Sequence, residues 1–167
     1  KMIDMPELAD ARLTLDDAGV ATLTLARDDV RNALTGTGLI PDIVNTCDWI
    51  NRNRAVGALV LTGDGKAFSW GGNVNEMRDK RGMFGGTPIE GQDGYRRGIQ
   101  QMTLAMYRLE VPAVAAINGP AIGAGLDLCC MCDIRIGSTH AKVGSTFVNL
   151  GIIPGDGGAW FLPRLIG

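Results

Sequence analysis

The fold is decided by Ala67-Phe68-Ser69-Trp70-Gly71-Gly72-Asn73-Val74-Asn75-Glu76-Met77 and by Asn118-Gly119-Pro120-Ala121-Ile122-Gly123-Ala124-Gly125-Leu126-Asp127. Each stretch follows an apolar, β-branched run and leads into a helix-like segment. A strand, a glycine-rich turn and a helix in this order leave unpaired backbone N–H groups at the positive end of the helix. Two such turns that face each other can hold one oxygen atom between two N–H donors. This is the geometry of an oxyanion hole, and it indicates chemistry at a carbonyl group.

The sequence on either side of these turns predicts alternating strands and helices. Alternating apolar residues predict an antiparallel hairpin over residues 12–15 and 20–26. Further strands are predicted over 58–62, 111–117 and 132–136, and helices over 39–50, 74–81, 95–109 and 126–131, with helical pieces at 147–150 and 156–162. The glycine-rich residues 82–94 are expected to form a mobile surface loop. The alternation predicts βαβ units and an α/β fold with a largely parallel sheet.

Length and charge limit the classes of function. The 167 residues are enough for one domain with a real core, which we expect to span residues 1–167. The net charge is −2 and the basic residues are scattered, so nothing favours nucleic acid or a membrane surface as a partner. No apolar run reaches the length of about 20 residues that spans a bilayer, and we expect a cytoplasmic protein.

Three of the four cysteines, Cys129, Cys130 and Cys132, crowd into one apolar segment. They could be metal ligands, but the only histidine, His140, brings no second ligand pattern. We therefore expect small buried residues in a reducing compartment and no metal site. His140 itself is expected at the surface or in packing rather than as a catalytic base.

Several short motifs occur in an order that resembles the enoyl-CoA hydratase/isomerase (crotonase) family over nearly the whole chain. They are Arg31-Asn32-Ala33-Leu34, Leu59-Val60-Leu61-Thr62-Gly63, Ala67-Phe68-Ser69, Gly71-Gly72-Asn73, Ala115-Ala116-Ile117-Asn118-Gly119, Cys132-Asp133-Ile134-Arg135 and Gly151-Ile152-Ile153-Pro154-Gly155. The resemblance implies the crotonase (ClpP-like) fold, in which repeated ββα units form a mostly parallel sheet flanked by helices. It covers the family's N-terminal catalytic core, so we expect the C-terminal helical region to be absent from this chain. It also implies a homotrimer or a hexamer.

The family binds acyl-CoA thioesters and stabilises an enolate-type oxyanion with two backbone N–H groups. By motif, these donors fall on Gly72 and Ala124. Coenzyme A enters as part of the substrate, and no separate cofactor is implied. The residues that the resemblance places at coenzyme A are Arg31, Ala33, Ser69, Gly71, Asn73, Val74 and Asn75, with Phe147 in the substrate pocket. Arg31 could pair with a phosphate or be an ordinary solvated arginine.

The chain departs from the family at both glutamates that handle water in hydratases. The first position holds Asp127, three residues after Ala124, where a carboxylate could act as acid and base or merely complement the helix dipole. The second holds Phe147, which cannot move a proton. Asp156 is a further candidate, although we favour its being the N-cap of the following helix.

These residues predict an enzyme that acts on an acyl-CoA thioester, with Gly72 and Ala124 as oxyanion donors and Asp127 as acid or base. Hydration of a 2-enoyl-CoA, or the reverse elimination, is the leading reaction. Isomerisation, hydrolysis and C–C cleavage within the same family remain alternatives, as does a non-catalytic member that binds acyl-CoA. A dinucleotide-binding enzyme is a weak alternative, because the glycines at 119, 123 and 125 have the wrong spacing.

Overall fold

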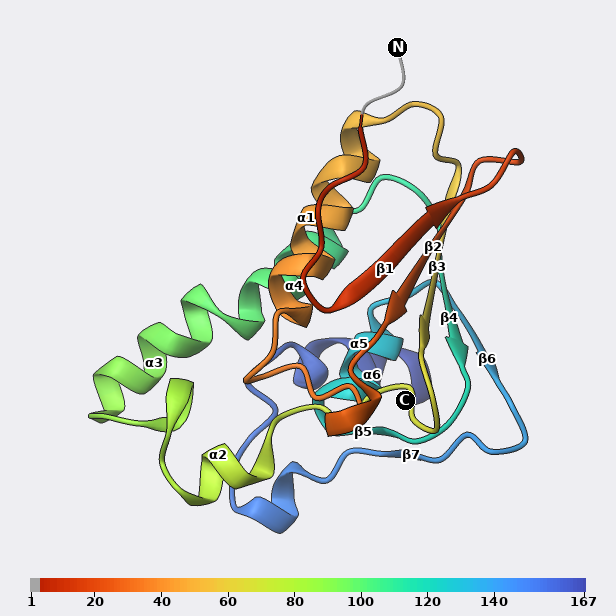
Figure 1. The fold of residues 1–167 in the computed structure, drawn as a ribbon. Coiled ribbons are helices and arrows are strands. Elements are labelled where there is room, and N and C mark those ends of the chain that lie inside the picture. Colours follow the sequence, from red (N-terminus) through yellow and green to blue (C-terminus); the bar gives the residue numbers. More distant parts are fainter. Residues whose placement is uncertain (1–3) are drawn as a thin grey trace.

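A five-stranded sheet forms the frame of the molecule in the computed structural model, which describes residues 4–167 (Figure 1). Its strands lie in the order β1 (Ala11–Leu15), β2 (Val20–Leu25), β3 (Ala58–Gly63), β4 (Ala113–Ile117) and β6 (Ile134–Gly137). The β1–β2 hairpin is antiparallel, and the other neighbours are parallel. The predicted hairpin and the largely parallel sheet are therefore confirmed.

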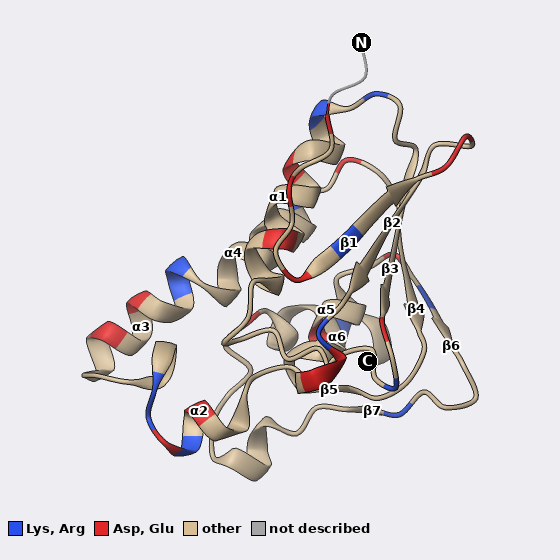
Figure 2. Ribbon diagram, in the orientation of Figure 1, with Lys and Arg blue, Asp and Glu red and all other residues tan. Residues whose placement is uncertain are grey.

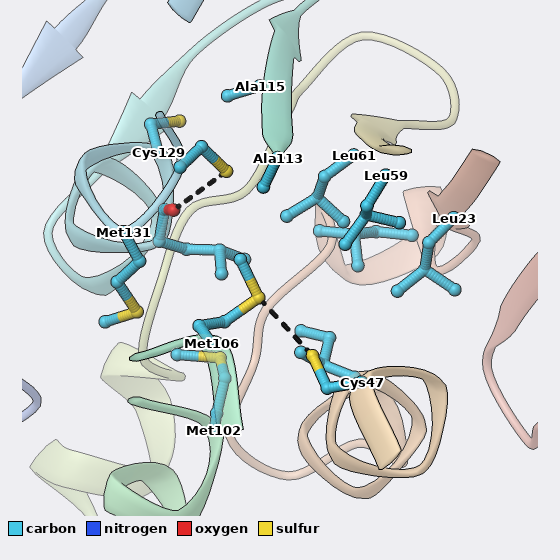
Figure 3. Close-up of a cluster of buried hydrophobic side chains, with 14 of the residues drawn as sticks. Leu23, Cys47, Leu59, Leu61, Met102, Met106, Ala113, Ala115, Cys129 and Met131 are labelled. Atoms are coloured by element: carbon cyan, nitrogen blue, oxygen red, sulfur yellow. Dashed lines mark hydrogen bonds between the residues drawn. The ribbon is translucent and has the colours of Figure 1, made fainter. Parts of the chain in front are cut away.

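The core lies on one face of this sheet. Every second residue of β2 and β4 is buried, and so are Leu59 and Leu61 of β3, as expected for strands with one face against helices. Leu23 and Leu61 from this face pack toward α1 (Leu39–Arg52) and α4 (Ile99–Tyr107). In Figure 3 the Cys47 thiol of α1 lies 3.6 Å from the Met106 sulfur of α4. This helical layer fixes the sheet from which both glycine-rich turns emerge.

The remaining elements surround the turns. They are the 3-10 helix η1 (Asp28–Val30), α2 (Val74–Arg78), η2 (Gly82–Phe84), α3 (Pro88–Arg97), α5 (Ala124–Cys130), η3 (Phe147–Leu150) and α6 (Gly158–Ile166), with a second sheet of β5 (Ala121–Ile122) and β7 (Val143–Gly144). Helix α5 begins at Ala124, two residues before the predicted start.

The prediction of a loop over residues 82–94 is wrong. The segment holds η2 and most of α3. The Thr87 hydroxyl accepts a hydrogen bond from the Glu90 N–H, and the Glu90 carboxylate accepts one from the Thr87 N–H, with Pro88 in the first turn. This capping box starts a helix despite the surrounding glycines. The predicted helix 95–109 is likewise interrupted, because Gly98 has a non-helical backbone between α3 and α4.

The cysteines and charges lie as predicted. Cys129, Cys130 and Cys132 are buried on and just after α5, and Cys47 is buried on α1. Basic and acidic residues are interspersed along the elements (Figure 2). Within residues 4–167, no helix has the length and apolar character to cross a membrane, and no three His, Cys, Asp or Glu side chains gather as metal ligands could.

Candidate active site

The two glycine-rich turns meet through their backbones. The N–H groups of Phe68 and Ser69 donate to the Pro120 carbonyl, and the Ile122 N–H donates to the Ser69 carbonyl at 3.0 Å. A Cβ atom at Gly71 would lie 2.6 Å from the Ile122 oxygen and 2.8 Å from the Ala124 nitrogen. Gly71 also has φ +74°, a left-handed conformation. Only glycine meets both requirements, so the contact depends on this residue.

Two backbone N–H groups lack a hydrogen-bond acceptor in the described part of the chain where the turns meet. Gly71 N–H donates to the Ser69 hydroxyl, and Asn73 N–H donates to the Thr35 hydroxyl. Within residues 4–167, the N–H groups of Gly72 and Ala124 have no acceptor. Ala124 is the first residue of α5, where the helix dipole favours negative charge. Both residues line one small cavity of about 20 Å³, so the structure brings the two predicted donors together.

Five of the seven predicted coenzyme A residues line a second cavity of about 490 Å³ that also reaches Gly72, whereas Ser69 and Gly71 do not line it. Its lining includes Arg31, Ala33, Asn73, Val74 and Asn75, together with Trp70. The Arg31 guanidinium lies 4.3 Å from the centre of the Trp70 ring, a cation–π contact. Arg31 is thus an exposed cation held beside the cavity by an aromatic side chain, which sequence reasoning did not anticipate.

Ser69 and Asn73 are occupied inside the protein. The Ser69 hydroxyl is fully buried and donates to the Asn32 carbonyl at 2.7 Å, and Ser69 is not among the residues that line the 490 Å³ cavity. The Asn73 side chain accepts from the N–H groups of Asn75 and Glu76, which makes it the N-cap of α2. Ser69 therefore joins the two turns, and Asn73 sets the direction in which α2 leaves the cavity.

Two buried carboxyl groups lie near the two N–H groups. Asp127 is fully buried on α5, and Asp156 is 2% exposed on the turn before α6. Within the described residues, neither carboxylate has a donor, so a hydrogen bond between the two needs a proton on one of them. Burial first, and then the charge and hydrogen bond of Asp156, raise the pKa of Asp127 to about 8. Burial also raises the pKa of Asp156. We therefore treat the pair as sharing one proton near neutral pH.

The two carboxyls differ in access. Asp156 lines the cavity of Gly72 and Ala124, whereas Asp127 does not. A Cβ atom at Gly158 would lie 2.3 Å from the Asp127 carboxylate, so the first turn of α6 covers that side chain. A group in the cavity can therefore contact Asp156 directly, whereas Asp127 can influence that group only through Asp156.

The favoured interpretation of Asp156 as a helix cap is wrong. Gly157 is the N-cap of α6, with φ 107°, and no side chain caps this helix. The turn is instead held from α4, where the Gln100 amide donates to the Gly155 carbonyl and the Thr103 hydroxyl donates to the Asp156 carbonyl. Sequence reasoning missed Gln100 and Thr103. The pattern that could have indicated them is two polar residues three positions apart, which lie on the same face of a helix that is otherwise half apolar.

The rest of the small cavity is apolar. Phe147, the first residue of η3, lines it, and His140 is exposed as expected. Sequence reasoning missed most of the remaining wall. These residues are Thr35, Met77, Met83, Phe84, Tyr95 and Ile99. Four of them lie between residues 74 and 97, and two of these four, Met83 and Phe84, fall within the predicted loop of residues 82–94. Their aromatic and methionine side chains were the available signal.

Comparisons with known proteins show the family to which the chain is similar. The enoyl-CoA hydratase/isomerase family model matches residues 16–167. An enoyl-CoA hydratase of Alternaria alternata is 34% identical over 152 residues, which are 91% of this chain and 49% of that protein. The short-chain-enoyl-CoA hydratase of Clostridium acetobutylicum is 36% identical over 89% of this chain and 54% of its own length.

A solved structure gives the same result. The crystal structure of a putative enoyl-CoA hydratase from Streptomyces coelicolor A3(2) superimposes with a TM-score of 0.85 at 35% identity, over 99% of this chain and 58% of that one. The chain spans about half the length of the relatives it matches. From the family match and the shared α/β architecture, we conclude that this chain belongs to the enoyl-CoA hydratase/isomerase family and has the crotonase fold.

Proposed function

We propose that this protein acts on an acyl-CoA thioester and polarises its carbonyl group with the N–H groups of Gly72 and Ala124. One observation carries the proposal: both donors lack an acceptor within residues 4–167 and both line one cavity. Such donors bind the oxyanion of an enolate more strongly than the ground-state carbonyl, and each is worth about 3–4 kcal/mol in the transition state.

Coenzyme A would lie in the 490 Å³ cavity, which adjoins the donors at Gly72. Asn73, Val74 and Asn75 would border the pantetheine arm, and Arg31 and Ala33 would face the adenine and phosphates. Arg31 is suited to a phosphate because Trp70 holds its guanidinium while leaving it exposed. We further propose a homotrimer or hexamer from the family resemblance alone, and a cytoplasmic location from the buried free cysteines.

The reaction we favour is hydration of a 2-enoyl-CoA, or its reverse, with Asp156 as the group that meets the substrate. The water oxygen bonds to Cβ and its proton passes to the Asp156 carboxylate. The enolate oxygen is held by the two N–H groups, and Asp156 returns the proton to Cα. Burial and the charge and hydrogen bond of Asp156 raise the pKa of Asp127 to about 8, and burial raises the pKa of Asp156, so the pair can hold and release a proton, which suits acid–base work.

Double-bond isomerisation is the second candidate. Phe147 lines the cavity and matches, by motif, the position of the family's second carboxylate, and Asp156 is the only carboxyl among residues 4–167 that lines this cavity. A single base that takes a proton from Cα and returns it to Cγ is sufficient for this reaction. The same residues would act, and no water would be consumed.

The test measures turnover of crotonyl-CoA and of 3-butenoyl-CoA by the whole chain. Asp156→Asn is expected to lower kcat by about 100-fold or more, because one acid–base group contributes about 10²–10⁴. The control Asp93→Asn removes an exposed carboxylate of α3 and is expected to leave kcat unchanged. Binding of both esters without turnover would contradict the catalytic proposal and favour an acyl-CoA-binding member of the family.

A further inference from the structure

The cavity beside the oxyanion donors is small. Its volume is about 20 Å³, which is the space of one or two water molecules. The cavity is lined by Gly72, Ala124 and Asp156 and also by Phe84 and Tyr95, which form an aromatic part of its wall. A thioester carbonyl placed between the donors would therefore leave little room for its acyl group before this aromatic wall.

The wall is an aromatic pair from two neighbouring elements. Phe84 of η2 and Tyr95 of α3 meet edge to face, with ring centroids 6.2 Å apart and planes at 78°. The Tyr95 ring is also packed against the turn that carries Asp156, because a Cβ atom at Gly155 would lie 3.0 Å from its Cε1 atom. The pair is thus braced on one side by the active-site turn.

A larger space lies on another side of the same pair. A cavity of about 300 Å³ is lined by Phe84 and Tyr95 together with Val74, Met77, Arg78, Leu150 and Ile152. Phe84, Tyr95 and Met77 are shared by the small and the large cavity. These three side chains therefore stand between the donors and a space that could take several methylene groups.

We propose that the Phe84–Tyr95 pair sets the chain length of the acyl group and favours short acyl-CoA esters over long ones. The inference rests on the proposed function. Its physical basis is the size of the rings, because overfilling a packed site costs free energy and each methylene group is worth about 10–200-fold in discrimination.

The experiment measures binding of butyryl-CoA and decanoyl-CoA by titration calorimetry, so it needs no turnover. The wild-type chain is expected to bind butyryl-CoA at least about tenfold more tightly. Phe84→Ala and Tyr95→Ala are each expected to reduce that preference at least about fivefold, because truncation joins the two cavities. Tyr95→Phe keeps the ring and is expected to keep the preference.

A matched control comes from a second aromatic pair. Tyr107 and Phe161 also meet edge to face, at 6.4 Å and 63°, and neither lines the small or the large cavity. Tyr107→Ala is expected to leave the preference unchanged. Similar affinities of the wild-type chain for both esters, or an unchanged preference in both alanine variants, would overturn the inference alone. If neither ester binds, the proposed function is overturned as well.

Discussion

The two sides of the site are built differently. The turns that carry Gly72 and Ala124 are joined by backbone hydrogen bonds and emerge from the ends of β3 and β4. The part of the cavity wall formed by Met77, Phe84 and Tyr95 comes from α2, η2 and α3, which contain no buried residue, and α3 projects away from the sheet in Figure 1. The donors are thus fixed by the core, whereas the acyl side can change with little effect on the rest of the fold.

The largest expected effect is on stability. Leu61→Ala in β3 empties a fully buried position and is expected to lower the free energy of unfolding by about 2–5 kcal/mol. Ile89→Ala in α3 alters a side chain that is 72% exposed. This variant is expected to change the free energy of unfolding by less than about 0.5 kcal/mol. Urea unfolding measures both. Equal losses would contradict the proposed contrast.

Gly71→Ala tests the contact between the turns. A Cβ atom there collides with Ile122 and Ala124, so the donors move apart and turnover of crotonyl-CoA is expected to fall about 100-fold or more. Gly151→Ala is the matched control, because Gly151 has a similar φ of +66° but no atom within 4 Å of the added Cβ. The control is expected to lose stability only. A similar loss of turnover in both variants would show that backbone strain, not the contact, matters.

The carboxyl pair makes stability depend on pH. The raised pKa values mean that, between about pH 4 and 8, the folded protein holds a proton that the unfolded chain releases. The free energy of unfolding therefore falls as pH rises through this window. Asp127→Asn removes one carboxyl and is expected to flatten the fall by more than about 1 kcal/mol, since one pKa unit corresponds to 1.36 kcal/mol. Urea unfolding at several pH values measures it. An unchanged slope would contradict the shared proton.

The smallest effect is expected at the start of α3. Thr87→Ala removes the capping box and is expected to destabilise this helix by about 1 kcal/mol. Hydrogen exchange of the α3 amides should accelerate while the global free energy of unfolding changes little. A global loss as large as that of Leu61→Ala would show that α3 is part of the core.

Much of this fold could be predicted from sequence because its signals are local. The hairpin, the alternation of strands and helices, and the turns at Gly71 and Gly123 each arise from a few consecutive residues. Helix α3 was missed although its capping box is also local, because the surrounding glycines were given more weight than Thr87 and Glu90. The interruption at Gly98 was missed for the opposite reason, since apolar spacing continues across it.

The sequence by itself determined the strand–turn–helix units, the family and the two backbone N–H groups that we propose as donors, because each depends on residue types at short spacing. Only the tertiary structure decided that Asp156 lines the cavity while α6 covers Asp127, and that Phe84 and Tyr95 line the same cavity. Asp127 and Asp156 are separated by β6, β7 and η3. Their encounter depends on how α6 packs against α5, and such a distant contact leaves no pattern along the chain.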